Sequence, residues 1–315
     1  MSTLTQLEYL LAVTSERHFG RAAKRCHVSQ PSLSLQIQKL EEELGVIIFD
    51  RTQKPINITE HGMDIVNQAK VILREHKRLH HIASESSDEP RGDFHLAVIP
   101  TVSQYLVPRF VGNFARDFPE VNLTIDEYKT EEIISLLKND QVDAGLLVTP
   151  LEEDGIEERI MFYEKFFAYL APGHPNLKKS QLSEFDLDEN NIWLLGEGHC
   201  FRDQVLRVCS LDKRRPVIEN IQFSGGNLET LKQMVARHGG FTLLPELAIE
   251  TITPKDQEAC IRPFQSPVPT REVSLAYSRS LYKKKILEAL ESAIKASLPE
   301  TIKQHRDTGT TIVGL

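Results

Sequence analysis

The sequence predicts an α/β protein in which a small helical N-terminal domain is joined by a long helix to a larger, two-lobed α/β domain. Three observations support this prediction. The 315 residues correspond to about two domains of average size. Helical periodicity fills the chain up to about residue 84, and beyond about residue 92 strands alternate with helices.

The composition is that of a globular protein. Hydrophobic residues make up 40% of the chain and charged residues 26%, which is enough for a sizeable core. No stretch approaches the ~18 to 20 apolar residues of a membrane span, and residues 1–4 do not begin a signal peptide. These features predict a cytoplasmic protein without a membrane partner. The net charge of -8 excludes a largely basic surface but is compatible with a local basic patch.

The N-terminal residues combine such a patch with short helices. Between residues 16 and 40, five basic residues stand against one acidic residue. A helix around residues 7–13 is followed by a second that begins at Phe19, and then by a turn. Ser29 and Pro31 are typical of a helix start, as the N-cap and a first-turn residue. Two helices joined by so short a turn predict a helix-turn-helix, whose second helix enters the DNA major groove.

The exposed face of that second helix is rich in hydrogen-bonding side chains. It carries Gln30, Ser32, Ser34, Gln36 and Lys39. Such groups can contact base edges and phosphates, whereas a solvated helix more often alternates Glu and Lys. Short polar helices are nevertheless common, so these residues alone leave a simple solvated helix open.

Residues 63–89 are predicted to form a linker helix and a hinge. Ile58, Ile65, Ile72 and Leu79 recur every seven residues, which is the pattern of a dimerising coiled coil. The alternative is an amphipathic helix that packs on its own domain. The polar run that ends at Pro90 predicts an exposed hinge.

From residue 90 onward, the alternation of strands and helices predicts a parallel sheet covered on both faces. The expected strands span 94–99, 121–128, 142–148, 166–170, 192–195, 218–223, 240–244 and 273–277, and the expected helices 105–118, 130–137, 200–209, 228–237 and 281–298. They form lobe I (about 90–165 and 269–300) and lobe II (about 166–268), followed by a C-terminal tail (301–315). A cleft is expected at the helix N-termini, where ligands and anions bind readily.

Two of the four cysteines carry the predicted chemistry. Cys200 lies between His199 and Arg202, whose positive charge would favour the reactive thiolate. Cys209 is the natural resolving partner. If the segment is helical, the two α-carbons lie roughly 13 Å apart, whereas a disulfide needs about 4.4 to 6.8 Å. Forming the bond would therefore require local refolding, as in a switch.

The simpler reading of a cysteine is that of a small buried hydrophobic residue, and it applies to Cys26 and Cys260. Near Cys200 there is neither a Cys-x-x-Cys nor a His-x-x-x-His pair, so we expect no metal site and no cofactor.

The N-terminal 62 residues contain an ordered series of motifs: Phe19-Gly20-Arg21-Ala22-Ala23, Val28-Ser29-Gln30-Pro31-Ser32-Leu33-Ser34, Ile37-Gln38-Lys39-Leu40-Glu41, Leu44-Gly45, Phe49-Asp50-Arg51 and Thr59-Glu60-His61-Gly62. This series resembles the LysR-type transcriptional regulators. The resemblance implies a winged helix-turn-helix over residues 1–62. Arg51 and Lys54 on the wing would contact phosphates, which hold register but carry no sequence information. The other implied DNA-binding residues are Gln30, Pro31, Ser32, Ser34 and Gln36.

Further motifs are similar to the peroxide-sensing members of this family. They are Ile99-Pro100-Thr101-Val102, Tyr105-Leu106-Val107-Pro108, Gly198 to Gln204, Cys209, Leu228-Glu229-Thr230-Leu231 and Thr242-Leu243-Leu244-Pro245. The resemblance implies a periplasmic-binding-protein-like, redox-sensing domain over residues 90–300. In it, peroxide would oxidise Cys200 to a sulfenic acid, which Cys209 would convert to a disulfide. The implied peroxide pocket comprises Thr101, Thr130, His199, Asp203 and Arg271.

The sequence departs from this pattern at two places. Phe201 stands where a smaller aliphatic residue is usual, and Ser224-Gly225-Gly226-Asn227 replaces the usual start of the next helix.

The leading hypothesis is therefore a transcription regulator, not an enzyme, that senses hydrogen peroxide and activates oxidative-stress defence genes. Its expected partners are double-stranded DNA, further copies of itself as homodimer and homotetramer, and RNA polymerase. His199 or Arg271 would stabilise the thiolate, and Asp203 or a water would protonate the departing hydroxide. Two alternatives stay open, a thiol peroxidase and a LysR-type regulator of a small organic anion with incidental cysteines.

Overall fold

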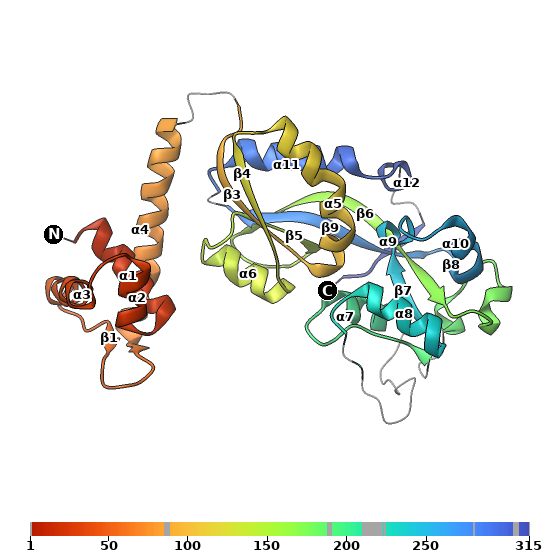
Figure 1. The fold of residues 1–315 in the computed structure, drawn as a ribbon, viewed down its shortest axis with the longest axis horizontal. Helices are drawn as coiled ribbons and strands as arrows, with labels where there is room; N and C mark the ends of the chain where they lie inside the picture. The colour runs from red at the N-terminus through yellow and green to blue at the C-terminus, as the bar shows by residue number, and fades with distance from the viewer. Residues whose placement is uncertain are drawn as a thin grey trace. The chain divides into compact units, whose positions relative to one another are not determined.

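The computed structural model describes residues 2–84, 89–187, 191–209, 223, 225–279, 281–304 and 309–314. The chain divides into two compact units, Met1–Asp88 and Glu89–Leu315 (Figure 1). In the described parts of the chain, no helix is both long enough and apolar enough to cross a membrane.

The first unit is a winged helix-turn-helix, as predicted. Its elements are α1 (Leu4–Glu16), α2 (Phe19–Arg25), α3 (Gln30–Leu44), β1 (Phe49–Asp50), β2 (Asn57–Ile58) and α4 (Glu60–Ser84). The Ser29 hydroxyl accepts a hydrogen bond from the Ser32 backbone N–H (3.3 Å) and so caps α3. Leu33, Ile37 and Leu40 form the buried face of this helix. Strands β1 and β2 pair antiparallel as the wing.

Helix α4 has two apolar faces. Val66, Ala69 and Leu73 are buried in the core of the first unit. Ile72 and Leu79, from the seven-residue repeat, are 41% and 67% exposed. One face therefore packs on its own domain. Of the predicted repeat, Ile58 lies in β2 and Ile65 packs against that core, so only Ile72 and Leu79 are available for the dimerisation that we predict.

The second unit contains all remaining elements. Its helices are α5 (Pro100–Asp117), α6 (Thr130–Lys138), α7 (Cys200–Val208), α8 (Leu228–His238), α9 (Glu246–Ile249), α10 (Pro254–Cys260), α11 (Lys284–Ser297) and α12 (Glu300–Lys303), with 3-10 turns at Pro175–Lys178 and Glu184–Asp186. Its strands are β3 (Gly92–Val98), β4 (Val121–Glu127), β5 (Ala144–Thr149), β6 (Ile156–Leu170), β7 (Phe241–Pro245), β8 (Ile261–Pro263), β9 (Val268–Ser278) and β10 (Thr310–Ile312).

The sheet of this unit is mixed, so the prediction of a purely parallel sheet is wrong. The strand order is β4-β3-β5-β9-β6-β7. Strand β3 pairs parallel with β4 and β5, but β9 runs antiparallel to both β5 and β6. The reason is that the chain returns to lobe I through β9, which enters between β5 and β6 and runs in the direction opposite to both. In lobe I, α5 and α11 lie on one side of the sheet and α6 on the other (Figure 1).

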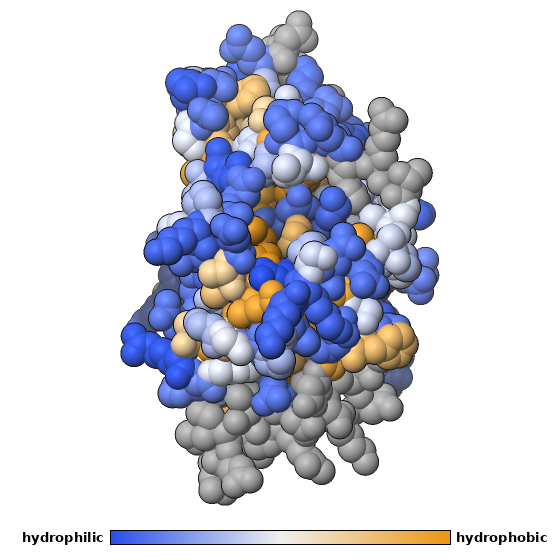
Figure 2. Space-filling view, turned by 90° about the vertical axis from the view of Figure 1, so that its right-hand side faces the viewer, coloured by the Kyte–Doolittle hydropathy of each residue, from blue (hydrophilic) through white to orange (hydrophobic). Residues whose placement is uncertain are grey.

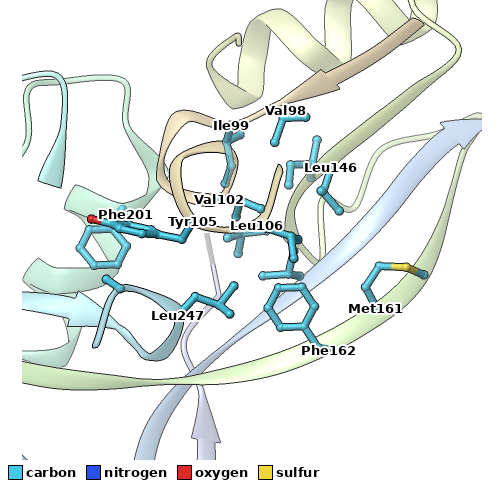
Figure 3. Packing of buried hydrophobic residues seen from close by; sticks show 14 of the residues in the cluster. Val98, Ile99, Val102, Tyr105, Leu106, Leu146, Met161, Phe162, Phe201 and Leu247 are labelled. Carbon is cyan, nitrogen blue, oxygen red and sulfur yellow. The ribbon is translucent and has the colours of Figure 1, made fainter. Parts of the chain in front are cut away.

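Strand β6 carries the chain from one lobe to the other. Its first part, up to Lys165, pairs with β9, and its last part, from Phe166, pairs with β7. The predicted strand 166–170 is therefore only the end of a strand of 15 residues. One buried apolar cluster continues across both lobes, and Figure 3 shows part of it, from Val98 and Leu146 to Phe201 and Leu247.

Helix α5 and the predicted strand 192–195 differ in extent from the prediction. Helix α5 begins at Pro100, five residues before the predicted start, because a proline is favourable at the first helical position. The predicted strand 192–195 is reduced to isolated bridges at Ile192 and Leu195. Most of the predicted strand 218–223, and Ser224, lie outside the described residues.

The region that the sequence sets apart as a C-terminal tail contains regular structure. Strand β10 pairs parallel with the start of β9. The Val313 backbone N–H donates to the Thr270 carbonyl (2.8 Å), and Val313 is buried. The molecular surface drawn in Figure 2 is mostly hydrophilic, and apolar side chains are visible near the centre of this face.

Candidate functional site

Helix α7 places Cys200 at its first position. The helix spans the nine residues Cys200–Val208, with His199 as N-cap. The preceding Gly198 has a φ of +81°, and a Cβ there would lie 2.9 Å from the Lys129 Nζ. Only glycine suits this position. Lys129 in turn donates to the Glu197 carbonyl (2.9 Å), so the turn before α7 is held against the start of α6.

A buried hydroxyl faces the Cys200 sulfur. The Thr130 Oγ1 is buried, and no hydrogen-bond partner for it occurs among the described residues. The Thr130 hydroxyl and the Arg271 charge both lower the pKa of the Cys200 thiol, as does the backbone at the helix start, but burial outweighs them and raises it. Cys200 is therefore mainly a thiol at neutral pH. When the thiolate does form, the Thr130 hydroxyl and the Arg271 charge are already in place to stabilise it.

Neither His199 nor Arg202 is among the groups that act most strongly on the pKa of the Cys200 thiol. Burial and the Lys129 charge lower the pKa of His199, so the imidazole is neutral at pH 7. Arg202 instead donates to the Leu195 carbonyl (3.3 Å). The helpful charge comes from Arg271, which is far from Cys200 in sequence.

Arg271 is fully buried and links several groups of the predicted pocket. Its Nη1 donates to the Thr101 hydroxyl and its Nη2 to the Thr101 carbonyl, both at 3.2 Å. Its guanidinium carbon lies 5.3 Å from the centroid of the Phe201 ring. That ring also packs on Phe166, with the centroids 5.4 Å apart. The large residue at 201 thus fills the space between β6 and Arg271.

The structure does not bring Cys209 to this site. Cys200 to Val208 is helical, as predicted, and Cys209 is the C-cap at the other end. The α-carbons are therefore separated by roughly 13 Å, and both thiols are free. Cys209 is 4% exposed, and burial raises the pKa of its thiol to about 12.

Asp203 lies on the exposed side of α7, and its charge opposes the thiolate by raising the pKa of Cys200.

Two further polar residues were not predicted. Gln204 is completely buried in α7, and its Nε2 donates to the Val313 carbonyl (2.7 Å). Glu164 is completely buried beside Arg271. Its only signal in the sequence is an acidic residue within an apolar strand.

The predicted DNA-binding residues of α3 and the wing have different environments. Gln30, Pro31, Ser32 and Lys54 are exposed. The Gln36 Oε1 accepts from the Gln6 Nε2 (3.2 Å). These exposed groups form the surface available to DNA, whereas the half-buried Gln36 also ties α3 to α1.

Arg51 has partners within its own unit. It pairs with the Glu41 carboxylate (2.8 Å) and donates to the Ser34 hydroxyl (3.4 Å). Its guanidinium carbon lies 5.0 Å from the centroid of the Phe19 ring. Leu35, which was not predicted, is 50% exposed on the same helix. An apolar side chain there is suited to contact with a thymine methyl group.

Comparison with known proteins agrees with both halves of the structure. Residues 4–63 match the bacterial regulatory helix-turn-helix protein, lysR family, and residues 87–299 match the LysR substrate binding domain. A hydrogen peroxide-inducible genes activator of Dickeya chrysanthemi is 36% identical, over 87% of this chain and 88% of the relative.

Solved structures show the same similarity. A full-length OxyR variant from Pseudomonas aeruginosa has a TM-score of 0.75 and 34% identity, and the match covers 94% of this chain and 98% of that one. A mutant OxyR of Corynebacterium glutamicum bound to hydrogen peroxide has a TM-score of 0.60 and 25% identity, covering 94% and 92%. The chain therefore belongs to the LysR family of bacterial helix-turn-helix transcription regulators.

Proposed function

We propose that this LysR-family regulator senses hydrogen peroxide by oxidation of Cys200 and then forms a Cys200–Cys209 disulfide. The observation that carries the proposal is the position of Cys200 at the start of α7, where its sulfur faces the buried, otherwise unpartnered hydroxyl of Thr130. The similar proteins named for peroxide response or solved with bound peroxide support it.

In the first step, the Cys200 thiolate attacks one oxygen of hydrogen peroxide. An S–O bond forms, the O–O bond breaks, the sulfur loses two electrons, and the departing hydroxide takes a proton to become water. Thr101 and Thr130 orient the peroxide by hydrogen bonds, and Arg271 stabilises developing negative charge. The neutral His199 and the exposed Asp203 can pass the proton from solvent.

In the second step, the Cys209 thiolate attacks the sulfenic sulfur, an S–S bond forms, and hydroxide leaves as water. Because helical geometry holds the two cysteines apart, this step requires α7 to unwind. The refolded segment would alter contacts between subunits of a homodimer or homotetramer, and thereby the activation of defence genes by RNA polymerase.

This arrangement supports a regulator rather than a thiol peroxidase. Rapid turnover needs a resolving thiol that is ready to attack, whereas Cys209 is buried with a raised pKa. The buried Arg271 also gives little support to an organic anion as effector, because Glu164 already pairs with its charge.

Thiol mapping by mass spectrometry, before and after brief exposure to micromolar peroxide, tests the proposal. We expect a single new link between Cys200 and Cys209. Cys26 and Cys260 serve as internal controls and should stay reduced, because neither has a cysteine partner in the proposed chemistry. Oxidation of either control before Cys200, or no oxidation at all, would contradict the proposed sensor.

A second prediction concerns DNA binding, for which Lys54 and Gln30 are expected to play different roles. Lys54→Ala should weaken binding to operator and random duplexes alike and lower the salt slope by about 1, because one phosphate contact is lost. Gln30→Ala should cost about 1–3 kcal/mol on the operator only, since it would contact a base edge. Titrations of both duplexes at several salt concentrations measure these effects.

Lys178→Ala is the matched control, because Lys178 is an exposed lysine of the regulatory unit. It should change neither affinity nor salt slope. Lys54 is a cleaner choice than Arg51, whose removal would also take away the ion-pair partner of Glu41. If Gln30→Ala lowered the affinity for the operator and the random duplex equally, Gln30 would not contribute to sequence recognition.

A further inference from the structure

We infer that Glu164 is a positioning residue for the reaction at Cys200: it fixes the Arg271 guanidinium so that the Thr101 hydroxyl must donate its hydrogen toward bound peroxide. This inference rests on the proposed function, and it adds a residue that lies outside the predicted peroxide pocket.

The strand register brings Glu164 and Arg271 together. Glu164 of β6 and Arg271 of β9 are directly opposite residues in the antiparallel pair. Side chains at such positions share one face of the sheet and interact directly. Both residues are fully buried, so water does not compete for their hydrogen bonds.

Both carboxylate oxygens of Glu164 are engaged. Oε1 accepts from the Arg271 Nε (2.7 Å) and from its Nη2, and Oε2 accepts from the Leu247 backbone N–H (3.2 Å). The carboxylate is thereby fixed between β9 and the start of α9. Because each of its two oxygens has a hydrogen-bond donor, the carboxylate cannot rotate freely, and it can hold the plane of the guanidinium in one orientation.

That orientation determines what Thr101 can do. A guanidinium has five N–H donors. Four are used, two on Glu164 and two on the hydroxyl and carbonyl of Thr101. Because the Thr101 oxygen already accepts from Nη1, its own hydrogen must point away from Arg271. That hydrogen is then free for another acceptor, and in the proposed function this acceptor is an oxygen of the peroxide.

The charge of Glu164 has a second effect. It offsets the positive charge of Arg271, which otherwise favours the Cys200 thiolate. Without Glu164, Arg271 would stabilise the thiolate more strongly but could turn away from Thr101. The amount of thiolate and the rate of reaction with peroxide should therefore change in opposite directions.

Glu164→Gln in the full-length reduced protein tests the inference by comparing two reagents. Iodoacetamide needs the thiolate but no proton donor, whereas peroxide needs both. We expect alkylation of Cys200 at pH 7 to become faster and peroxide oxidation to become slower by about tenfold or more. Stopped-flow rates over a pH series separate the two effects, because the thiolate fraction is measured independently. Oxidation at the wild-type rate would overturn the inference.

Glu246→Gln is the matched control. Glu246 is also a buried acid of this region, 8% exposed, and it accepts from the Lys165 backbone N–H (3.3 Å). No bond between it and Arg271 occurs among the described residues. The charge of Glu246 acts on Glu164 but leaves the hydrogen bonds of Arg271 in place, so both rates should stay much closer to the wild type than those of Glu164→Gln. A loss as large as that of Glu164→Gln would show a general effect of removing a buried acid and would overturn the inference.

A double-mutant cycle tests whether Glu164 acts through Arg271. In an Arg271→Gln background, Glu164→Gln should cause no further loss of peroxide reactivity, because the guanidinium that it positions is gone. An equal loss in both backgrounds would contradict the inference. Glu164→Asp, which keeps the buried charge but shortens its reach, provides the same test if the amide variant does not fold.

The outcomes also separate this inference from the proposed function. If wild-type Cys200 does not react with peroxide, the proposed function fails. If the wild type reacts and Glu164→Gln reacts equally fast, only the positioning role of Glu164 fails.

Discussion

Cys200→Ser is expected to abolish peroxide-dependent activation of a target promoter while leaving operator affinity in the reduced state unchanged. Serine is close to cysteine in size, so α7 and the packing of Phe201 should persist. Its hydroxyl cannot form the sulfenic acid, and therefore no disulfide follows. DNA affinity should persist because the helix-turn-helix belongs to a separate compact unit.

A promoter reporter and operator titrations measure both effects. Cys260→Ser is the matched control, since Cys260 is also a free cysteine but is buried at the end of α10. It should respond to peroxide like the wild type. Normal induction in Cys200→Ser would rule out the sensor mechanism.

Oxidation is expected to remove the hydrogen-exchange protection of α7. The helical amides from Gln204 to Cys209 should exchange faster in the disulfide form, by on the order of a hundredfold, because the backbone must leave the helix to close the S–S bond. Phe201, Val205 and Val208, which are buried in the reduced protein, would then repack. Hydrogen exchange followed by mass spectrometry on both forms measures this change.

Two helices serve as references in that experiment. Helix α8 belongs to the same unit, and the part of α4 around Ile65 and Ile72 belongs to the other. Their protection should change less than that of α7. Identical exchange of α7 in both forms, with the disulfide present, would mean that the bond closes without unwinding, and the refolding mechanism would be wrong.

The features that could be predicted from sequence are local ones. The cap at Ser29, the turn before it and the apolar face of α3 lie within a few residues of one another, so their pattern is visible directly. The helical segment between Cys200 and Cys209 is visible for the same reason. The strand alternation was also predicted, but the direction of β9 depends on partners that are distant in the chain.

The electrostatics of the site depended on such distant partners. The neighbours of Cys200 in the chain suggest His199 and Arg202 as the charges that act on it, and only the family resemblance points to Arg271. Arg271, which does act there, is 107 positions from Glu164 in the chain, and only the register of β6 against β9 joins them. Burial, which raises the pKa of Cys200, is likewise a property of the folded domain.

The bond from Gln204 to Val313 has a consequence for the order of synthesis. The two residues are 109 positions apart, so Val313 leaves the ribosome well after Gln204. A nascent chain that already contains both cysteines therefore lacks the strand against which the buried amide of Gln204 is satisfied. The N-terminal DNA-binding unit can be complete while the sensor is still unfinished. Loss of the segment that contains Val313 would therefore act directly on α7.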